Sequence, residues 1–201
     1  MERTTSIWIS GVGGQGTLLA SELVAMAALE HGLDAKKSEV HGMAQRGGSV
    51  VSQVRLGKKV YSPLIPEGDA DVLLAFEKVE ALRYCHVLAP GGSIIMNDQE
   101  IPSSTTLAGI EQYPDRVPER LREVTERLAI VPAEAEARAL GNVKVMNVVL
   151  LGVLSRLLPM PETVWETVIR ARVPAKFVDL NLRAFRRGRE LAAASKGFLV
   201  S

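Results

Sequence analysis

A glycine-rich motif close to the N-terminus has the spacing of a phosphate-binding loop. It consists of Gly11, Gly13, Gly14, Gln15 and Gly16. Glycines at these positions let backbone amides and the first turn of a following helix approach a pyrophosphate, as in dinucleotide-binding loops. The motif therefore indicates an anion-binding loop. An ordinary glycine connection without a ligand stays open as the alternative.

A second group of polar and ionisable residues lies further along the chain, after an expected strand. Its members are His41, Gln45, Arg46, Gly47, Gly48 and Ser49. The planar guanidinium of Arg46 suits a phosphate or a carboxylate, and the glycines allow close approach of the backbone. This composition predicts a second loop that binds a ligand or a partner. The alternative is a tight connection with Arg46 in a surface salt bridge.

Other candidate residues support different interpretations. Glu39 stands where a nicotinamide-dependent enzyme holds the ribose of its coenzyme, so a free-standing NAD(P)- or nucleotide-binding protein stays open. His31 and His86 match no metal-ligand pattern and are expected to be structural. The last helix carries a basic stretch that is expected to be a solvated face or to meet an acidic partner. Its residues are Arg183, Arg186, Arg187 and Arg189.

The periodicity of apolar residues predicts the elements that position these loops. Strands are predicted at residues 6–10, 35–40, 49–56, 71–76, 93–97 and 128–131. Helices are predicted at residues 17–31, 77–88, 118–127, 145–158, 161–170 and 177–196. A turn at 57–59 predicts an antiparallel hairpin that ends in a short strand at 60–62. We expect strands 6–10 and 35–40 to be neighbours whose carboxyl ends open on one crevice.

Alternation of strands and helices predicts an α/β fold, a three-layer α/β/α sandwich with a mostly parallel, mixed sheet. Its first strand–loop–helix unit is Rossmann-like, and its C-terminal third is helical. No internal repeat and no Gly/Ser/Pro-rich linker divides the sequence, so residues 1–201 are expected to form one domain. A non-catalytic α/β scaffold stays open as a third interpretation.

Composition limits the classes of partner and cofactor. The 24 Lys and Arg nearly balance the 23 Asp and Glu, so neither nucleic acid nor a membrane surface is an expected partner. Cys85 is the only cysteine and cannot supply the four thiolates of an iron–sulfur cluster. The N-terminus has no signal-peptide pattern, and the most apolar stretch is shorter than a bilayer span of about 20 residues. We therefore expect a cytoplasmic protein without a metal of its own.

The two glycine-rich motifs together resemble the gamma-type domain of the 2-oxoacid:ferredoxin oxidoreductase family. The second motif, residues 39–50, is most similar to the indolepyruvate ferredoxin oxidoreductase branch, in which this domain is the small beta subunit. The resemblance continues through residues 61–66, 147–152 and 181–188, so it covers nearly the full chain. It is weakest over residues 98–137.

The resemblance implies a division of labour between two chains. A large alpha subunit is expected to hold thiamine diphosphate and the iron–sulfur clusters, to pass electrons to ferredoxin and to release an acyl-coenzyme A. This chain lacks those ligands, because Gly68-Asp69 is followed by Ala70 and not by the glycine of a thiamine motif. It is therefore expected to have no catalytic residue and no activity alone. As part of a hetero-oligomer, it would present its two loops to coenzyme A, to the substrate or to the large subunit.

Overall fold

The computed structural model describes residues 4–41 and 48–194, and its centre is a six-stranded sheet. The strands are β1 (Thr5–Val12), β2 (Asp34–His41), β3 (Ser49–Gly57), β4 (Ala70–Ala75), β5 (Leu88–Asn97) and β6 (Leu128–Val131). Their order across the sheet is β2-β3-β1-β4-β5-β6. Strands β1, β4, β5 and β6 are parallel, whereas β3 is antiparallel to both of its neighbours. The sheet is mixed and mostly parallel, as predicted.

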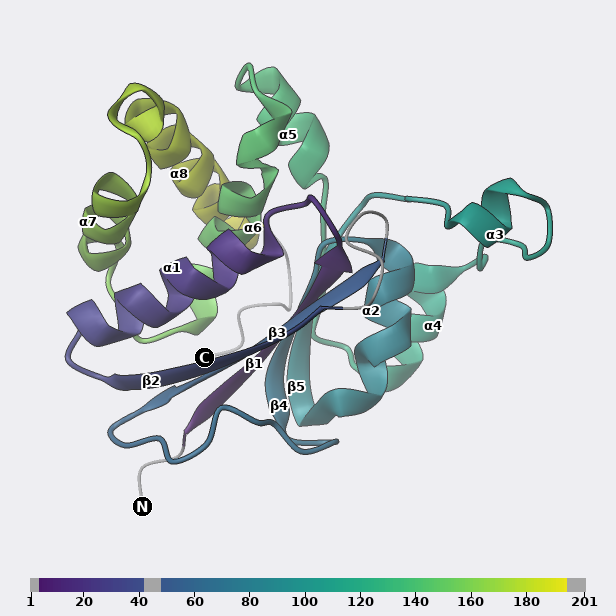
Figure 1. The fold of residues 1–201 in the computed structure, drawn as a ribbon, viewed down its shortest axis with the longest axis horizontal. Helices are drawn as coiled ribbons and strands as arrows, with labels where there is room; N and C mark the ends of the chain where they lie inside the picture. Colours follow the sequence, from purple (N-terminus) through teal and green to yellow (C-terminus); the bar gives the residue numbers. More distant parts are fainter. Residues whose placement is uncertain (1–3, 42–47, 195–201) are drawn as a thin grey trace.

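Helices cover both faces of this sheet and complete the predicted three-layer sandwich (Figure 1). One face carries α1 (Thr17–Glu30), α5 (Ala133–Ala139), α6 (Met146–Leu154), α7 (Glu162–Arg172) and α8 (Val178–Ala194). The other face carries α2 (Lys78–Tyr84) and α4 (Val117–Val124). A short helix, α3 (Ser104–Leu107), lies on an arm that projects from the body (Figure 1). The predicted α/β fold and the helical C-terminal third are confirmed.

The alternation of side chains along β1 shows why both faces must be covered. Ile7 and Ile9 are fully buried in the cluster beneath α1 and α6, whereas Trp8 packs against the cluster on the α2 face. All nine residues of α6 are buried, so this helix forms the centre of the larger apolar layer. In the described part of the chain, no helix is long and apolar enough to cross a membrane.

The prediction that strands β1 and β2 are neighbours was wrong, because β3 lies between them. β2 and β3 pair as an antiparallel hairpin, and β3 pairs with β1 along its other edge. Val50 and Val51 on β3 point to opposite faces and are both buried, as expected of an interior strand. The carboxyl ends of β1 and β2 nevertheless lie at the same end of the sheet.

The predicted hairpin from strand 49–56 to residues 60–62 was also wrong. The Val60 amide donates to the Asp34 carboxylate at 2.8 Å, and no strand is assigned between β3 and β4. Pro63 and Pro66 follow and have no amide to give to a strand ladder. The segment from residue 58 to residue 69 is therefore a connection without a strand, and Ile65 within it packs against Ala70 and Val87.

Candidate functional site

The first glycine loop joins the end of β1 to the start of α1, as the sequence predicted. Gly14 and Gly16 have φ values of 103° and 85°, which side chains rarely adopt. A Cβ added at Gly16 would lie 2.7 Å from Nδ2 of Asn147, at the start of α6. Gly16 is also the N-cap of α1 and makes no side-chain capping bond. Both backbone conformation and packing therefore require glycine at this position.

Gln15 fastens this loop to the ends of two other strands. Its Oε1 accepts the Val12 amide at 2.7 Å, and its Nε2 donates to the Phe76 carbonyl at 2.9 Å and to Oε1 of Gln99 at 2.8 Å. Gln99 in turn donates to a carboxylate oxygen of Glu134 at 2.7 Å. The Gln15 side chain is thus engaged within the protein. These bonds tie the loop to the sheet at the point where the chain leaves β1 for α1 on one face and leaves β4 for α2 on the other.

The two glycine-rich motifs meet at the same end of the sheet. The Gly13 amide donates to the Gly48 carbonyl at 3.0 Å, and Ser49 pairs with Val12 in the β1–β3 register. His41 ends β2 at this same end, paired with Val50. Gln45, Arg46 and Gly47 lie outside the described residues, as does the His41 side chain. For the described members, the predicted common location of the two motifs is confirmed.

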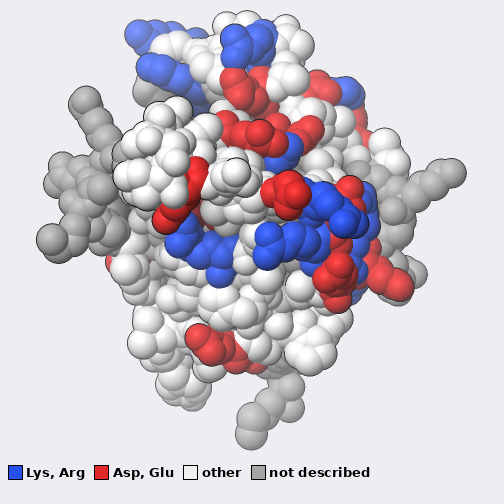
Figure 2. Space-filling view, turned by 90° about the vertical axis from the view of Figure 1, so that its right-hand side faces the viewer, with Lys and Arg blue, Asp and Glu red and all other residues white. Residues whose placement is uncertain are grey.

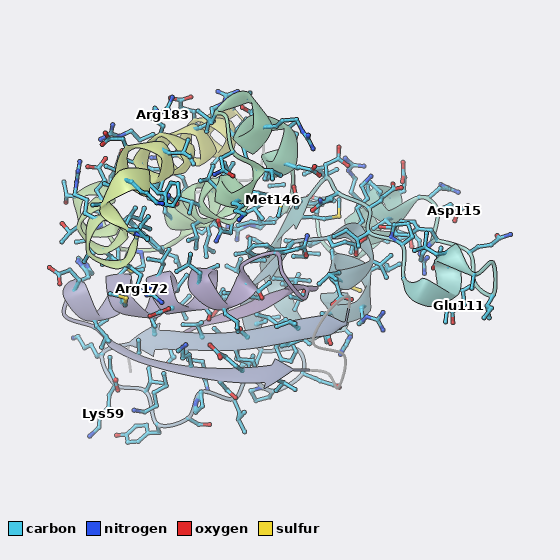
Figure 3. The ribbon with its side chains drawn as sticks, turned by 45° about the horizontal axis from the view of Figure 1, so that its top comes forward. Lys59, Glu111, Asp115, Met146, Arg172 and Arg183 are labelled. Carbon is cyan, nitrogen blue, oxygen red and sulfur yellow. The ribbon has the colours of Figure 1, made fainter. Side chains whose placement is uncertain are left out.

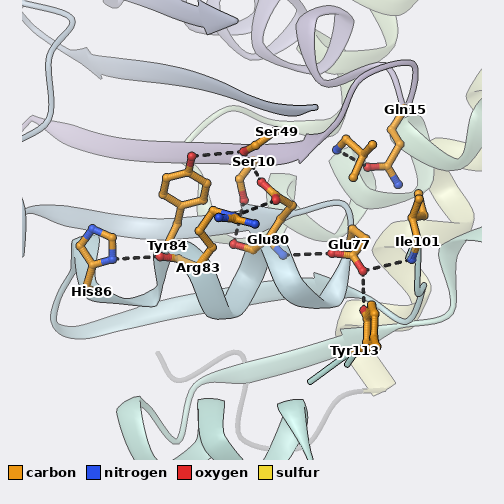
Figure 4. Close-up of polar contacts among 11 residues, drawn as sticks. Ser10, Gln15, Ser49, Glu77, Glu80, Arg83, Tyr84, His86, Ile101 and Tyr113 are labelled. Atoms are coloured by element: carbon orange, nitrogen blue, oxygen red, sulfur yellow. Dashed lines mark hydrogen bonds and ion pairs between the residues drawn. The ribbon is translucent and has the colours of Figure 1, made fainter. Parts of the chain in front are cut away.

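Glu80 is a buried carboxylate that holds the start of β3, at the base of the second motif, and that sequence reasoning missed. Glu80 on α2 is 4% exposed, and its Oε2 accepts the Ser49 hydroxyl at 2.5 Å (Figure 4). The Ser49 hydroxyl also lies 3.2 Å from the Tyr84 hydroxyl, and Arg83 Nε donates to Glu80 at 3.1 Å. Burial raises the pKa of the Glu80 carboxyl, and the bonds from Ser49 and Arg83 oppose that shift.

Glu77 is a second buried carboxylate that sequence reasoning missed. It is 1% exposed, caps α2 by accepting the Glu80 amide at 3.0 Å, and accepts the Ile101 amide at 3.2 Å (Figure 4). The Tyr113 hydroxyl donates to the same carboxylate. Burial, and then the Glu77 carboxylate, raise the pKa of Tyr113. The arm that carries α3 is therefore anchored at both of its ends to Glu77, at the start of α2.

A cleft of about 440 Å³ opens between this arm, α2 and the ends of β1 and β3. Such a position, outside the carboxyl ends of parallel strands, is where α/β sheets bind ligands. The charged residues that line it are Glu77, Glu80, Arg83 and Glu111. Over the whole face that carries the arm, acidic and basic side chains are interspersed (Figure 2). Among the described residues that line the cleft, three of the four charged side chains are carboxylates.

The described residues do not fit the redox cofactors that the resemblance implies for the family. Cys85 is half-buried, its thiol lies 3.2 Å from the Leu82 carbonyl, and burial raises its pKa. No group of three or more potential metal ligands is found among the residues that the structure describes. Asp69, beside the missing thiamine glycine, faces Arg55 at 3.7 Å.

Several of the remaining candidates make contacts within the chain. Glu39 accepts Lys37 at 2.6 Å on the edge strand β2, separated from the first glycine loop by β3, which does not suit a ribose-binding acid. Nδ1 of His86 donates to the Arg83 carbonyl at 3.0 Å. The basic stretch of α8 pairs with acids on α5 and α7. These pairs are Arg186–Glu166, Arg187–Glu136 and Arg189–Glu162.

Comparison with known proteins agrees with this fold. Residues 6–191 match the family model described as pyruvate ferredoxin/flavodoxin oxidoreductase. Subunit IorB of indolepyruvate oxidoreductase from Thermococcus kodakarensis is 42% identical over 199 residues, which cover 96% of this chain and 98% of that protein. IorB from Pyrococcus horikoshii is 43% identical over 190 residues, 91% of this chain and 93% of that protein.

A solved structure supports the same assignment. The gamma subunit of a keto/oxoacid ferredoxin oxidoreductase from Geobacter sulfurreducens superposes with a TM-score of 0.75 at 26% identity, covering 96% of this chain and 98% of that chain. The resemblance noted from the two motifs is therefore confirmed over nearly the full length. The chain belongs to the pyruvate ferredoxin/flavodoxin oxidoreductase family, and its sequence is similar to the IorB subunits of indolepyruvate oxidoreductases.

Proposed function

We propose that this chain is the cofactor-free subunit of an aryl 2-oxoacid:ferredoxin oxidoreductase, with indolepyruvate as the expected 2-oxoacid. All 201 residues would act as one gamma-type domain in a cytoplasmic hetero-oligomer. The large alpha subunit would carry thiamine diphosphate and the iron–sulfur clusters. The assembled enzyme would decarboxylate the 2-oxoacid oxidatively, transfer the acyl group to coenzyme A and pass the electrons to ferredoxin.

The observation that carries this proposal is the contact between the two glycine-rich motifs, through the 3.0 Å bond from the Gly13 amide to the Gly48 carbonyl. The described ends of two motifs that resemble the same family thereby meet. We propose that the motifs form one surface that contacts coenzyme A, the substrate or the large subunit. The residues proposed for it are Gly11, Gly13, Gly14, Gln15, Gly16, His41, Gln45, Arg46, Gly47, Gly48 and Ser49.

The contribution of such a surface to catalysis is positioning and exclusion of water, and not bond making. Gln15 and Glu80 hold the described parts of the loops from the protein side. A loop that is already ordered loses little conformational entropy when it closes on a ligand or a partner, so more of the contact energy is available for orientation. A phosphate would have to use the amides of Gly14, Gly16 and the first turn of α1, because the Val12 and Gly13 amides are engaged.

We expect the purified chain to show no oxidation of indolepyruvate with ferredoxin or a viologen dye. Activity should appear only after co-expression with a large subunit that carries a thiamine motif and cluster-binding cysteines. The two chains should then co-purify, and dye reduction should depend on both. The measurement is dye reduction by each chain alone and by the pair, at equal protein concentration. Turnover by this chain alone would contradict the proposed division of labour.

We expect Arg46→Ala in the assembled enzyme to raise the apparent KM for coenzyme A. If Arg46 binds a coenzyme A phosphate, loss of one charge-assisted contact should raise KM roughly 10- to 150-fold. Dye reduction without coenzyme A should change less. Arg156→Ala is a matched control, because Arg156 is exposed and lies in the short 3-10 helix after α6, outside both glycine-rich motifs. Intact assembly with unchanged kinetics would remove Arg46 from the proposed surface, and loss of co-purification would assign it to the subunit interface.

A further inference from the structure

Helix α2 holds the first residue of β3 through two side chains. Glu80 and Tyr84 are one helical turn apart on α2, so they lie on the same side of that helix. Both reach the Ser49 hydroxyl, which lies 2.5 Å from Oε2 of Glu80 and 3.2 Å from the Tyr84 hydroxyl (Figure 4). Ser49 directly follows Gly48, whose carbonyl accepts the Gly13 amide. The helix is therefore connected to the point where the two glycine-rich motifs meet.

The hydrogen bonds around Ser49 form a chain with one direction. An ionised carboxylate only accepts hydrogen bonds and a serine hydroxyl has one hydrogen, so Ser49 donates to Glu80. The Tyr84 hydroxyl is then the donor to Oγ of Ser49. Tyr84 in turn packs against Trp8 of β1, with ring centres 5.5 Å apart. The chain of bonds runs from Tyr84 through Ser49 and ends on the Glu80 carboxylate.

These side-chain bonds restrain the start of β3 in a direction that the sheet restrains less. In the sheet, Ser49 pairs with Val12 of β1, and the next residue, Val50, pairs with His41 of β2. Ladder hydrogen bonds between such pairs lie in the plane of the sheet, so they oppose separation of the strands more than bending of a strand end out of the plane. Because α2 covers one face of the sheet, its bonds to Ser49 oppose that bending.

Glu80 would be a costly residue for this contact if stability were its only role. It is 4% exposed, and burial raises the pKa of its carboxyl although the bonds from Ser49 and Arg83 oppose that shift. The folded chain therefore holds the Glu80 proton more tightly than the unfolded chain, so ionisation of Glu80 lowers the stability of the fold at neutral pH. The Arg83 side chain is 55% exposed and compensates little. A buried charge that lowers stability is a candidate for a functional role.

We propose that Glu80 is a positioning residue for the second glycine-rich motif and acts through the Ser49 hydroxyl. An ionised acceptor makes a shorter and stronger bond than a neutral one, so it fixes the strand end more closely. Glu80 thus sets where Gly48 and Ser49 stand relative to Gly13. The contact itself is independent of the family assignment. Its effect on turnover rests on the proposed function, in which the two motifs contact coenzyme A, the substrate or the large subunit.

The test is amide hydrogen exchange of the full-length chain, measured by NMR at the Gly13 amide, which donates to Gly48. Glu80→Met keeps an unbranched side chain of similar length and removes the acceptor. We expect it to lower the protection of the Gly13 amide about 5- to 50-fold, while the urea midpoint stays at or above that of wild type. Glu80→Gln keeps one acceptor oxygen for Ser49 and should recover most of the protection.

A second variant and a control show whether the effect passes through Ser49. Ser49→Ala should match Glu80→Met, and the double variant should lose no more protection than either alone, because both changes break the same bond. Glu77→Gln is the matched control. Glu77 is the other buried carboxylate at the start of α2 and holds the arm of α3 instead, so the Gly13 amide should stay protected. A purely structural Glu80 would give a lower urea midpoint in Glu80→Met with Gly13 as protected as in wild type.

The same variants in the assembled enzyme separate this inference from the proposed function. Glu80→Met and Ser49→Ala should lower kcat/KM by similar factors, mainly through a higher apparent KM, and Glu80→Gln should restore it. If the isolated chain shows the expected exchange pattern but never forms an active oxidoreductase, the positioning stands and the proposed function fails. If an active complex forms and Glu80→Met leaves either the Gly13 protection or the kinetics unchanged, Glu80 is not a positioning residue and the proposed function is unaffected.

Discussion

Replacing Gly188 by alanine is expected to lower the free energy of unfolding by about 3 kcal/mol, although alanine is the better helix former. Gly188 on α8 lies directly against Gly152 on α6, and a Cβ added at Gly188 would stand 1.9 Å from the Val149 carbonyl oxygen. Because this oxygen belongs to the backbone of α6, it cannot move away by a change of rotamer. The two helices must therefore move apart, which opens the contact along the all-buried helix α6.

Urea unfolding followed by tryptophan fluorescence measures this effect. Of the two tryptophans, Trp165 is fully buried and stacks on Phe185 of α8 with ring centres 5.8 Å apart. The control is Arg183, an exposed residue on the outer face of α8 (Figure 3). Arg183→Ala should be more stable than Arg183→Gly by about 1 kcal/mol, which isolates helix propensity in the same helix. A Gly188→Ala protein as stable as wild type would show that the helices are not held at this distance.

Local patterns were sufficient to predict the first strand–loop–helix unit and the layered architecture. The glycine motif follows a short β-branched strand and precedes a helix that ends at Glu30, one residue from the predicted end. Each of these signals depends on residues close together in the sequence. The order of strands depends on pairing between distant segments, and the alternation of residues 49–56 did not reveal that this strand is interior and pairs along both edges.

The residues of the candidate site likewise fall into those that local sequence patterns reveal and those that depend on distant contacts. Glycines, Gln15 and Ser49 are visible in the sequence because their types and spacing are unusual. Glu77 and Glu80 instead belong to an ordinary helix start, and acidic residues there are common. Their burial follows only when the arm folds back, since Glu77 contacts Ile101 and Tyr113, which are 24 and 36 residues away. No short-range pattern contains that information.

Replacing Glu77 by glutamine is expected to lower the free energy of unfolding by about 2 to 4 kcal/mol, because three donors converge on this carboxylate. Two are the amides of Glu80 and Ile101, and the third is the Tyr113 hydroxyl. Glutamine has the same shape but offers one acceptor oxygen, and its amide nitrogen would face a donor. In a site that is 1% exposed, water cannot readily replace the lost bonds.

Tyr113→Phe is the matched control, because it removes one of the three donors and leaves the carboxylate with both backbone amides. It should cost about 0.5 to 1.5 kcal/mol, clearly less than Glu77→Gln. Hydrogen exchange should locate the larger loss, with the Glu80 and Ile101 amides becoming less protected while the Gly13 amide is unchanged. That pattern would show that Glu77 holds the arm of α3 over the cleft. Equal costs for the two variants, or unaltered protection of Ile101, would mean that the arm is held by its other contacts.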